Sequence, residues 1–429
     1  MALDGTRTYV GFGFGAIQAG LFLYEAFQSG AFRRLVAAEV MPDVVAAVRR
    51  SAGNFTVNIA HADRVEHARF GPVQIEDPAQ EADRERLIEA LAEADEIGTA
   101  VPSVAFYDSP GPGSLHRILA SGLRRKAAVG GPRAVVYAAE NHNHAAEILE
   151  AKVMAEIPEA EREAVGGRVR FLNTVIGKMS GVVAEADEIE AAGLTPVTPG
   201  SPRAFLVEAF NRILISRIHF EMPFARGIAV FEEKDDLLPF EEAKLYGHNA
   251  THALAAYLAM ARGLARIADL PAADGLLPFI RAAFIEESGT ALIRKHAGVD
   301  PLFTPEGYQA FADDLLRRMT NPYLRDTAER VGRDPARKLG WDDRLIGTMR
   351  VALRQGVIPR RYAMGAAAAL AALRPDAAGV PAGTLLDPLW RDAQPEPAER
   401  QAVLELIEKG RVRLRQWAAS GFPPAALGF

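Results

Sequence analysis

The stretch YVGFGFGAIQAGLFLYEAFQSGAFRRLVAAE, residues 9–39, decides the fold of the first part of the chain. Its opening run Tyr9–Phe12 is apolar and predicts a strand, and residues 16–28 repeat apolar side chains at helix spacing. A further apolar run, residues 35–40, predicts the next strand. With a glycine-rich turn between a strand and a helix, the helix N-terminus can face the phosphates of a dinucleotide. The stretch therefore predicts a dinucleotide-binding unit.

Two alignments of the dinucleotide fingerprint fit this turn. One is Gly11-x-Gly13-x-x-Ala16, and the other is Gly13-x-Gly15-x-x-Gln18. We favour the second, because it keeps the whole apolar run in the strand, turns the chain at Gly13 and lets the helix start near Ala16. A glycine-rich turn that binds nothing is the alternative to both.

Gln18 is the unusual residue of the favoured alignment. It stands where a small side chain normally lets the helix and the strand approach closely. We expect Gln18 to face the pyrophosphate or the sheet from the first helical turn, with Gly20 permitting the close approach.

An acidic residue, Glu39, ends the second strand. A carboxylate at this point accepts the hydroxyls of a ribose and repels a 2′-phosphate. No Arg or Lys follows at once, so we expect NAD as the cofactor in preference to NADP. The candidate cofactor-binding residues are Gly13, Gly15, Ala16, Ile17 and Glu39, with Thr99, Ala100 and Val101 at the end of a later strand.

The composition excludes several classes of protein. The chain has 429 residues, of which 49% are hydrophobic and 24% charged, as in ordinary globular proteins. A net charge of −6 and the lack of a Lys/Arg stripe argue against nucleic-acid binding. No apolar run reaches the ~18 residues of a transmembrane helix, and no signal-peptide pattern opens the chain. The absence of cysteine excludes disulfides and thiolate chemistry. We expect a cytoplasmic protein with no membrane partner.

The domain organisation follows from a change of pattern near residue 200. Before it, apolar runs such as residues 55–59, 96–101 and 134–139 alternate with helical stretches, which predicts parallel strands. After it, nearly every segment has helical spacing. We therefore expect an α/β protein: a Rossmann-type doubly wound sheet that binds NAD in residues 1–200, then a mainly α-helical substrate and catalytic domain in residues 201–429. The active site is expected between the two.

The segment FEEAKLYGHNATHALAAYLA, residues 240–259, carries the candidate catalytic groups. In a regular helix four side chains would share an arc of about 140° on one face: Lys244, His248, Asn249 and His252. A lysine that is desolvated beside other cations has its pKa lowered toward neutrality and can act as a general base. An asparagine amide can donate to a developing alkoxide, and a histidine can orient hydroxyl groups. The alternative is a helix start with ordinary polar residues.

These residues resemble the signature of a known family. The pattern K-x-x-x-x-N-x-x-H, formed by Lys244, Asn249 and His252, is similar to that of the polyol-specific long-chain dehydrogenases, the mannitol dehydrogenase family. Further segments resemble the family in the same order, so that the resemblance covers most of the chain: FGFGAIQAGLF at 12–22, AAENHNH at 138–144, FLNTVIGKM at 171–179 and NPYLRDTAERVGRDPARKLGWDDRLIG at 321–347.

The resemblance implies a metal-independent NAD oxidoreductase that acts on a polyol or a polyol phosphate. It implies that Lys244 is the general acid/base, that Asn249 and Asn141 form the oxyanion site, and that His252 binds substrate. The similarity is greatest to members that interconvert mannitol 1-phosphate and fructose 6-phosphate. Free polyols and sugar acids such as altronate and fructuronate are alternative substrates, and a non-catalytic NAD-binding sensor is a further alternative. Monomer and dimer are both open.

One departure from the family pattern concerns the substrate. Many members carry Val-Asp-Arg where this chain has Ile176, Gly177 and Lys178. An acidic side chain that could contact the substrate is therefore absent at Gly177.

Basic residues supply the other candidates for substrate binding. Arginine forks suit phosphate oxygens, and a group of cations lies in the segment 330–344. The candidates are His248, Arg330, Arg333 and Lys338, with Arg337 and Arg344 in the same cluster. The alternative is ion pairing with interleaved acids such as Asp326 and Asp334. His142 and His144 have a poor spacing for a metal pair, and we expect no metal.

Overall fold

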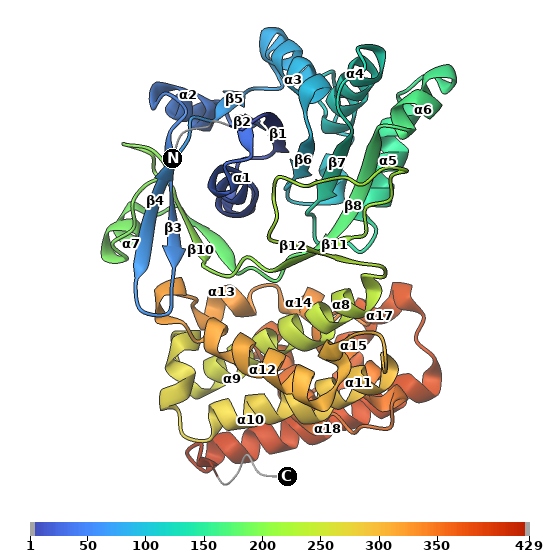
Figure 1. The fold of residues 1–429 in the computed structure, drawn as a ribbon. Helices are drawn as coiled ribbons and strands as arrows, with labels where there is room; N and C mark the ends of the chain where they lie inside the picture. Colours follow the sequence, from blue (N-terminus) through green and yellow to red (C-terminus); the bar gives the residue numbers. More distant parts are fainter. Residues whose placement is uncertain (1–4, 425–429) are drawn as a thin grey trace. The chain divides into compact units, whose positions relative to one another are not determined.

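The computed structural model describes residues 5–424 of the chain. The chain forms two compact units, unit 1 (Met1–Leu238) and unit 2 (Pro239–Phe429). Figure 1 shows the sheets in unit 1 and the helices that make up unit 2.

Unit 1 is built on a mostly parallel sheet of eight strands in the part of the chain that the structure describes. In spatial order they are β12 (Phe231–Lys234), β11 (Ile213–Ser216), β8 (Val169–Val175), β7 (Ala134–Ala138), β6 (Glu96–Thr99), β1 (Arg7–Phe12), β2 (Phe32–Ala38) and β5 (Gln74–Glu76). Every pair from β8 to β5 is parallel, and this order is that of a doubly wound dinucleotide-binding fold. β11 joins β8 antiparallel.

Both faces of this sheet are covered, which explains why its strands are apolar along their length. Successive side chains of a strand point to opposite faces. Val10 therefore packs with α3 (Glu81–Glu93), α4 (Leu115–Ala128) and α5 (Ala145–Ala155), while Tyr9 packs on the other face. The elements on Tyr9's face include the π-helical turn η1 (Gln18–Leu23), α1 (Tyr24–Ser29), α2 (Pro42–Arg50) and the strands of a second sheet. Two shorter helices complete unit 1: α6 (Glu159–Gly166) and α7 (Ala186–Ala191).

A second sheet departs from the expected alternation. Its order is β4 (Val65–Phe70), β3 (Phe55–Ala60), β10 (Ala204–Glu208) and β9 (Ser180–Val183). The predicted strand at residues 55–59 is present as β3, but it pairs with β4 and β10 and not with the parallel sheet. A single apolar run specifies a strand without specifying its partner, and β10 comes nearly 150 residues later, as the pairing of Val57 with Phe205 shows.

The division into units comes later in the chain than the change of pattern near residue 200. β10, β11 and β12 complete the two sheets of unit 1, so unit 1 extends to Leu238. These strands are only four or five residues long.

Unit 2 is helical, so the expected fold class, an α/β chain with a helical C-terminal part, is confirmed. Its longer helices are α9 (Ala250–Arg262), α12 (Pro305–Met319), α15 (Arg344–Arg354), α16 (Arg360–Leu373) and α18 (Pro397–Ala419). Shorter ones are α8 (Leu238–Glu242), α10 (Leu276–Ala282), α11 (Thr290–Lys295), α13 (Ala328–Gly332), α14 (Pro335–Lys338) and α17 (Ala382–Trp390), with the π turns η3 (Ala243–Asn249) and η5 (Ala283–Gly289). The alanine-rich α16 packs closely, since a Cβ at Gly410 of α18 would stand 2.4 Å from the Ala363 carbonyl.

Candidate active site

The chain leaves β1 at Gly13. This residue has φ +85°, a conformation that glycine adopts without strain. Its amide donates to the Ala38 carbonyl at 2.9 Å, and a Cβ here would stand 2.7 Å from the Ala100 carbonyl. Gly11 lies inside β1 and is paired with both β2 and β6. The turn therefore begins at Gly13, as the second alignment expects.

A helix starts directly after this turn. The helical backbone begins at Ala16 and Ile17, and the Ala19 amide donates to the Gly15 carbonyl at 2.9 Å. A Cβ built on Gly15 meets nothing within 4 Å. A helix N-terminus with open space beside a glycine is a site that a phosphate can approach, because the first helical amides lack partners within the helix.

Gln18 faces the sheet. Its side chain is buried, and its amide nitrogen donates to the Tyr9 hydroxyl at 2.7 Å. A Cβ at Gly11 would stand 2.0 Å from this nitrogen, so Gly11 makes room for Gln18. The expectation for Gly20 needs a correction: its Cβ would stand 2.6 Å from Val207, so it permits contact with the second sheet rather than with β1.

Glu39 lies against the glycine turn. Its two carboxylate oxygens accept hydrogen bonds from the backbone amides of Phe14 and Met41, each with 2.9 Å between nitrogen and oxygen. Only 8% of the residue is exposed. A carboxylate has four lone-pair positions, so two bonds leave further acceptor capacity for a ligand hydroxyl. The turn, the helix start and this acid therefore fit a dinucleotide.

Thr99, Ala100 and Val101, at the end of β6, lie beside the glycine turn. The Ala100 amide donates to the Phe12 carbonyl at 2.9 Å. The Thr99 hydroxyl and the Val101 amide donate to the two carboxyl oxygens of Glu140 at 2.8 and 2.9 Å. Burial raises the pKa of Glu140 above its ordinary value. Glu140 was not singled out from the sequence. Its carboxyl holds Thr99 and Val101, and the next residue in the chain, Asn141, is exposed.

Lys178 has a structural place in unit 1. Its ammonium is buried and donates to the carbonyls of Glu208 and Phe210. It therefore ties the segment around Gly177 to the end of β10.

Lys244, His248 and Asn249 all lie in the π turn η3, which continues directly into α9 with His252. A π turn is hydrogen-bonded from residue i to i+5. Lys244 and Asn249 are therefore one turn apart, and the arc of about 140° calculated for a regular helix is wrong for this segment. The imidazole rings of His248 and His252 are 6.3 Å apart.

The electrostatics of this segment favour uncharged side chains. Burial and the positive charge of Arg344 lower the pKa of Lys244 to about 8. Burial, together with cations that include Arg330, lowers the pKa of His252 to about 3, and burial lowers that of His248 as well. The lysine can therefore exchange a proton near neutral pH, while both imidazoles are neutral.

The predicted basic cluster lies beside these residues. The charges of Arg330, Lys338 and Arg344 act on His252, and that of Arg344 acts on Lys244 as well. Burial and neighbouring cations lower the pKa of Lys338 to about 8, and Arg333 is among those neighbours. The structure thus brings the candidates of unit 2 together around Arg344.

Ion pairing, the alternative reading of the cluster, accounts for part of it. Arg330 pairs with the buried Asp326, and Arg337 pairs with Asp334 at 3.2 Å. Asp326 also lies 3.7 Å from the ring of His252, so it stands beside two candidate substrate-binding residues. Sequence reasoning treated Asp326 only as a counter-charge. The four-residue spacing of Asp326 and Arg330 was the signal in the sequence that could have indicated this ion pair.

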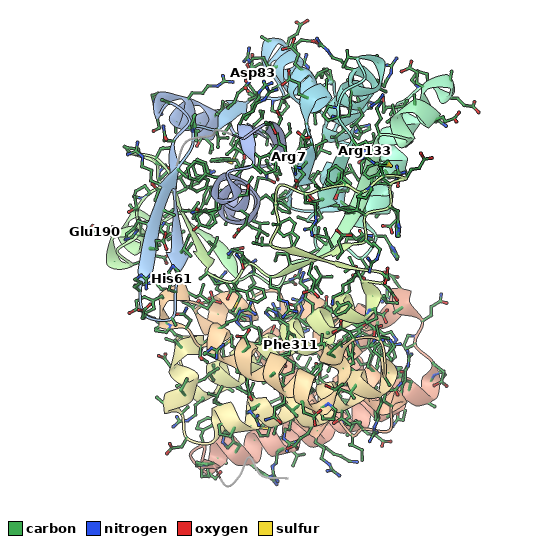
Figure 2. All side chains as sticks on the ribbon, viewed as in Figure 1. Arg7, His61, Asp83, Arg133, Glu190 and Phe311 are labelled. Atoms are coloured by element: carbon green, nitrogen blue, oxygen red, sulfur yellow. The ribbon has the colours of Figure 1, made fainter. Side chains whose placement is uncertain are left out.

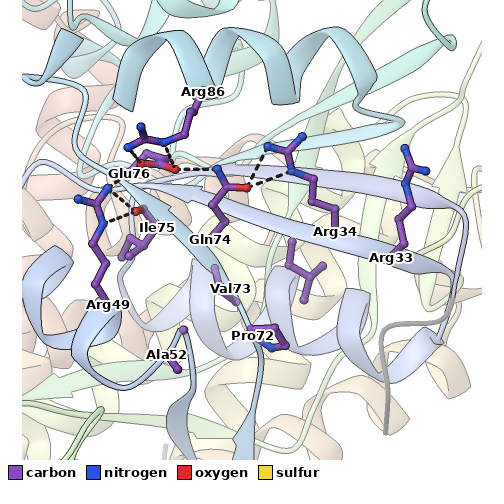
Figure 3. Close-up of a pocket in the computed structure, with 12 residues that line it drawn as sticks. Arg33, Arg34, Arg49, Ala52, Pro72, Val73, Gln74, Ile75, Glu76 and Arg86 are labelled. Atoms are coloured by element: carbon purple, nitrogen blue, oxygen red, sulfur yellow. Dashed lines mark hydrogen bonds and ion pairs between the residues drawn. The ribbon is translucent and has the colours of Figure 1, made fainter. Parts of the chain in front are cut away.

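A cavity of about 400 Å³ lies elsewhere in unit 1, beside β5 (Figure 3). Arg49 and Arg86 both bind Glu76 there, at 2.6 and 2.8 Å. Asp83 of α3, which is labelled in Figure 2, binds the same two arginines. These groups satisfy one another, and none of the predicted site residues lines this cavity.

Residues 5–424 also bear on two other kinds of site. Those residues contain no group of three His, Asp or Glu side chains that could hold a metal ion. No helix described there is long and apolar enough to cross a membrane.

Similar proteins point to one family. Residues 236–411 match the mannitol dehydrogenase C-terminal domain. The chain is 30% identical over 323 residues to the mannitol-1-phosphate 5-dehydrogenase of Bacillus licheniformis, covering 74% of this chain and 76% of that protein. The chain belongs to the mannitol dehydrogenase family. It is an oxidoreductase of that family, and the matched domain contains both the Lys244 segment and the basic cluster.

Solved structures with a similar fold include two polyol dehydrogenases. D-sorbitol dehydrogenase in substrate-free form has a TM-score of 0.75 at 15% identity, over 99% of this chain and 96% of that one. The Pseudomonas fluorescens mannitol 2-dehydrogenase, in a ternary complex with NAD and D-mannitol, has a TM-score of 0.70 at 17% identity, over 100% and 95% of the two chains.

Proposed function

We propose that this protein is a NAD-dependent dehydrogenase that interconverts mannitol 1-phosphate and fructose 6-phosphate. The observation that carries the proposal is the position of Lys244, with its pKa lowered to about 8, beside the cations of the segment 330–344. A general acid/base next to a basic cluster fits an alcohol that also bears a phosphate. The dehydrogenase names of its relatives support the reaction class.

NAD is the proposed cofactor of unit 1. The residues proposed to hold it are Gly13, Gly15, Ala16 and Ile17 at the pyrophosphate, Glu39 at the adenosine ribose, and Thr99, Ala100 and Val101 at the end of β6. Their support is the open helix start and the spare acceptor capacity of Glu39. When bound, NAD supplies the hydride acceptor in oxidation, and its reduced form supplies the donor in reduction.

The residues of this chain would handle the proton. Neutral Lys244 takes the proton of the substrate hydroxyl at its Nζ in oxidation, and its ammonium form returns the proton in reduction. The side-chain amides of Asn249 and Asn141 donate to the same oxygen as negative charge develops on it. His248 and His252, held neutral by their lowered pKa values, orient the other hydroxyls.

The substrate phosphate is assigned to the basic cluster. Arg330 and Arg333 offer guanidinium forks that match phosphate oxygens, and Lys338 adds a compact charge. Burial of Lys338 strengthens its attraction to an anion, because a medium of low dielectric constant weakens the interaction between two charges less than water does.

The test is a substrate comparison with the purified protein. NADH oxidation is measured with fructose 6-phosphate, fructose and fructuronate at equal concentrations. Two charge-assisted bonds to phosphate are expected to raise kcat/KM for fructose 6-phosphate about 100-fold above that for fructose. Equal values for the two ketoses would contradict the phosphate site, and preference for fructuronate would favour the sugar-acid alternative. NADH binding without turnover of any ketose would favour the sensor alternative.

A further inference from the structure

The π turn η3 leaves one backbone carbonyl without its usual partner. In an α-helix the Ala250 amide would donate to the Tyr246 carbonyl, four residues earlier. Here it donates to the carbonyls of Leu245 and Gly247. π turns are rare in proteins, so the surroundings of η3 have to favour it over the α-helix.

Two other helices supply donors to the Tyr246 carbonyl. The hydroxyls of Ser288 and Thr348 lie 2.9 and 3.1 Å from it. The hydroxyls of Ser288 and Tyr308 are 3.1 Å apart, and since the serine proton goes to the carbonyl, Tyr308 is the donor of that pair. Thr348 also donates to the Arg344 carbonyl, so its single proton is shared and Ser288 is the stronger donor.

Glycines let these helices come within reach of η3. A Cβ at Gly247 would stand 2.6 Å from the Tyr308 hydroxyl, and one at Gly289 would stand 2.7 Å from the ring of the same tyrosine. A Cβ at Gly347 of α15 would stand 2.5 Å from the ring of Tyr246. η5 and α15 can therefore approach closely enough for hydroxyl groups to reach the backbone of η3.

Tyr308 is itself held by aromatic packing. Its ring centroid lies 5.6 Å from that of Phe284 and 5.6 Å from that of Phe311, which is labelled in Figure 2. Both pairs have the edge-to-face geometry that aromatic rings prefer. Tyr308, which donates to the Ser288 hydroxyl, is thus held in place by its aromatic neighbours.

We infer that Ser288 is a positioning residue whose hydroxyl holds η3 in the π turn and so sets the placement of Asn249 relative to Lys244. The inference rests on the proposed function, in which both residues contact the reacting oxygen. If η3 relaxed to an α-helix, Asn249 would lie about 140° around the helix axis from Lys244, whereas the π turn places the two residues one turn apart.

The first test is the variant Ser288→Ala. A misplacement of about 1 Å can lower the rate about 100-fold, so we expect kcat to fall between 10- and 100-fold. The dissociation constant of NADH is expected to be unchanged, because the residues proposed to bind it lie in unit 1. Ser288→Thr keeps the hydroxyl and should restore most of kcat. Thr320→Val is the matched control, since it removes a hydroxyl bond to the Leu316 carbonyl of α12 and should leave kcat unchanged.

A double-mutant cycle separates positioning from loss of stability. If Ser288 acts through Asn249, Ser288→Ala should lower kcat far less in an Asn249→Ala background than in the wild type. Equal effects in both backgrounds would overturn the inference. So would a lower melting temperature of Ser288→Ala with an unchanged kcat.

A crystal structure of Ser288→Ala gives a readout that does not depend on activity. We expect the Ala250 amide to donate to the Tyr246 carbonyl in the variant. An unchanged π turn would overturn the inference even if the protein is a dehydrogenase. A wild type that turns over no ketose would instead contradict the proposed function.

Discussion

The carboxylate of Glu39 accepts a hydrogen bond from the backbone amide of Phe14, with 2.9 Å between oxygen and nitrogen. The acid that ends β2 therefore also closes the turn that follows β1. An uncharged side chain of the same shape would keep an acceptor for the turn and lose the charge that repels a 2′-phosphate.

For Glu39→Gln we expect the ratio of kcat/KM with NAD to that with NADP to fall about tenfold, the equivalent of one charged hydrogen bond. Initial rates with both cofactors measure this ratio. A wild type that prefers NADP would contradict the role of Glu39.

Two glycines of the turn should respond differently to alanine. A Cβ at Gly15 meets open space, whereas one at Gly11 would stand 2.0 Å from the side chain of Gln18. Gly15→Ala is expected to keep the melting temperature and weaken NADH binding, because the Cβ occupies the approach of the pyrophosphate. Gly11→Ala is expected to lower the melting temperature. Calorimetric NADH titration and thermal unfolding check both variants, and tight NADH binding by Gly15→Ala would speak against the cofactor site.

Removal of the Lys244 amine should stop proton transfer without affecting the cofactor. For Lys244→Ala we expect kcat to fall by about 100-fold or more, the usual contribution of a general acid/base. The dissociation constant of NADH should stay the same. Lys409→Ala, a change at an exposed residue of α18, serves as the control and should keep full activity. If Lys244→Ala lost NADH binding instead, its assignment as the acid/base would be wrong.

The pH dependence of the two directions should be opposite. Burial, with a contribution from Arg344, lowers the pKa of Lys244 to about 8. Oxidation needs the neutral amine, so its kcat should rise with pH and level off above about 8, while kcat for reduction should fall over the same range. In Arg344→Met the nearby positive charge is absent, so both profiles should move to higher pH. Profiles that do not move would exclude Arg344 as a cause of the shift.

Glu287 should make the stability of unit 2 depend on pH. Burial raises the pKa of this carboxyl from its ordinary value of 4.5 to about 7. A raised folded-state pKa gives stability that is present below the unfolded value and lost as pH rises through the folded one. The loss is about 3 kcal/mol between pH 4.5 and 7. Glu287→Gln carries no charge at any pH, so its melting temperature relative to the wild type should be higher at pH 8 than at pH 4.5. A constant difference would contradict the shift.

Several features of unit 1 were predictable from neighbouring residues alone. The strand, turn and helix around Gly13 follow from an apolar run, a glycine and a helical repeat that lie next to one another in the chain. The same holds for β3, whose residues predict a strand. Its sheet was not predictable, because the choice of partner depends on β10, a segment far along the chain.

The candidate site divides in the same way. Lys244, Asn249 and His252 could be found from their spacing, because a family signature is a property of consecutive residues. The π turn that carries Lys244 and Asn249 could not, since it depends on a hydroxyl from Ser288 and on glycines in other helices.

The sequence by itself determined which residue types stand at each turn, strand and helix face, because these depend on short-range periodicity and backbone preference. Only the tertiary structure decided that Gln18 faces Tyr9 and that Asp326 lies beside His252. It also decided that the pKa of Lys244 lies near 8. Those properties arise from burial and from charges far apart in the chain, which no local pattern specifies.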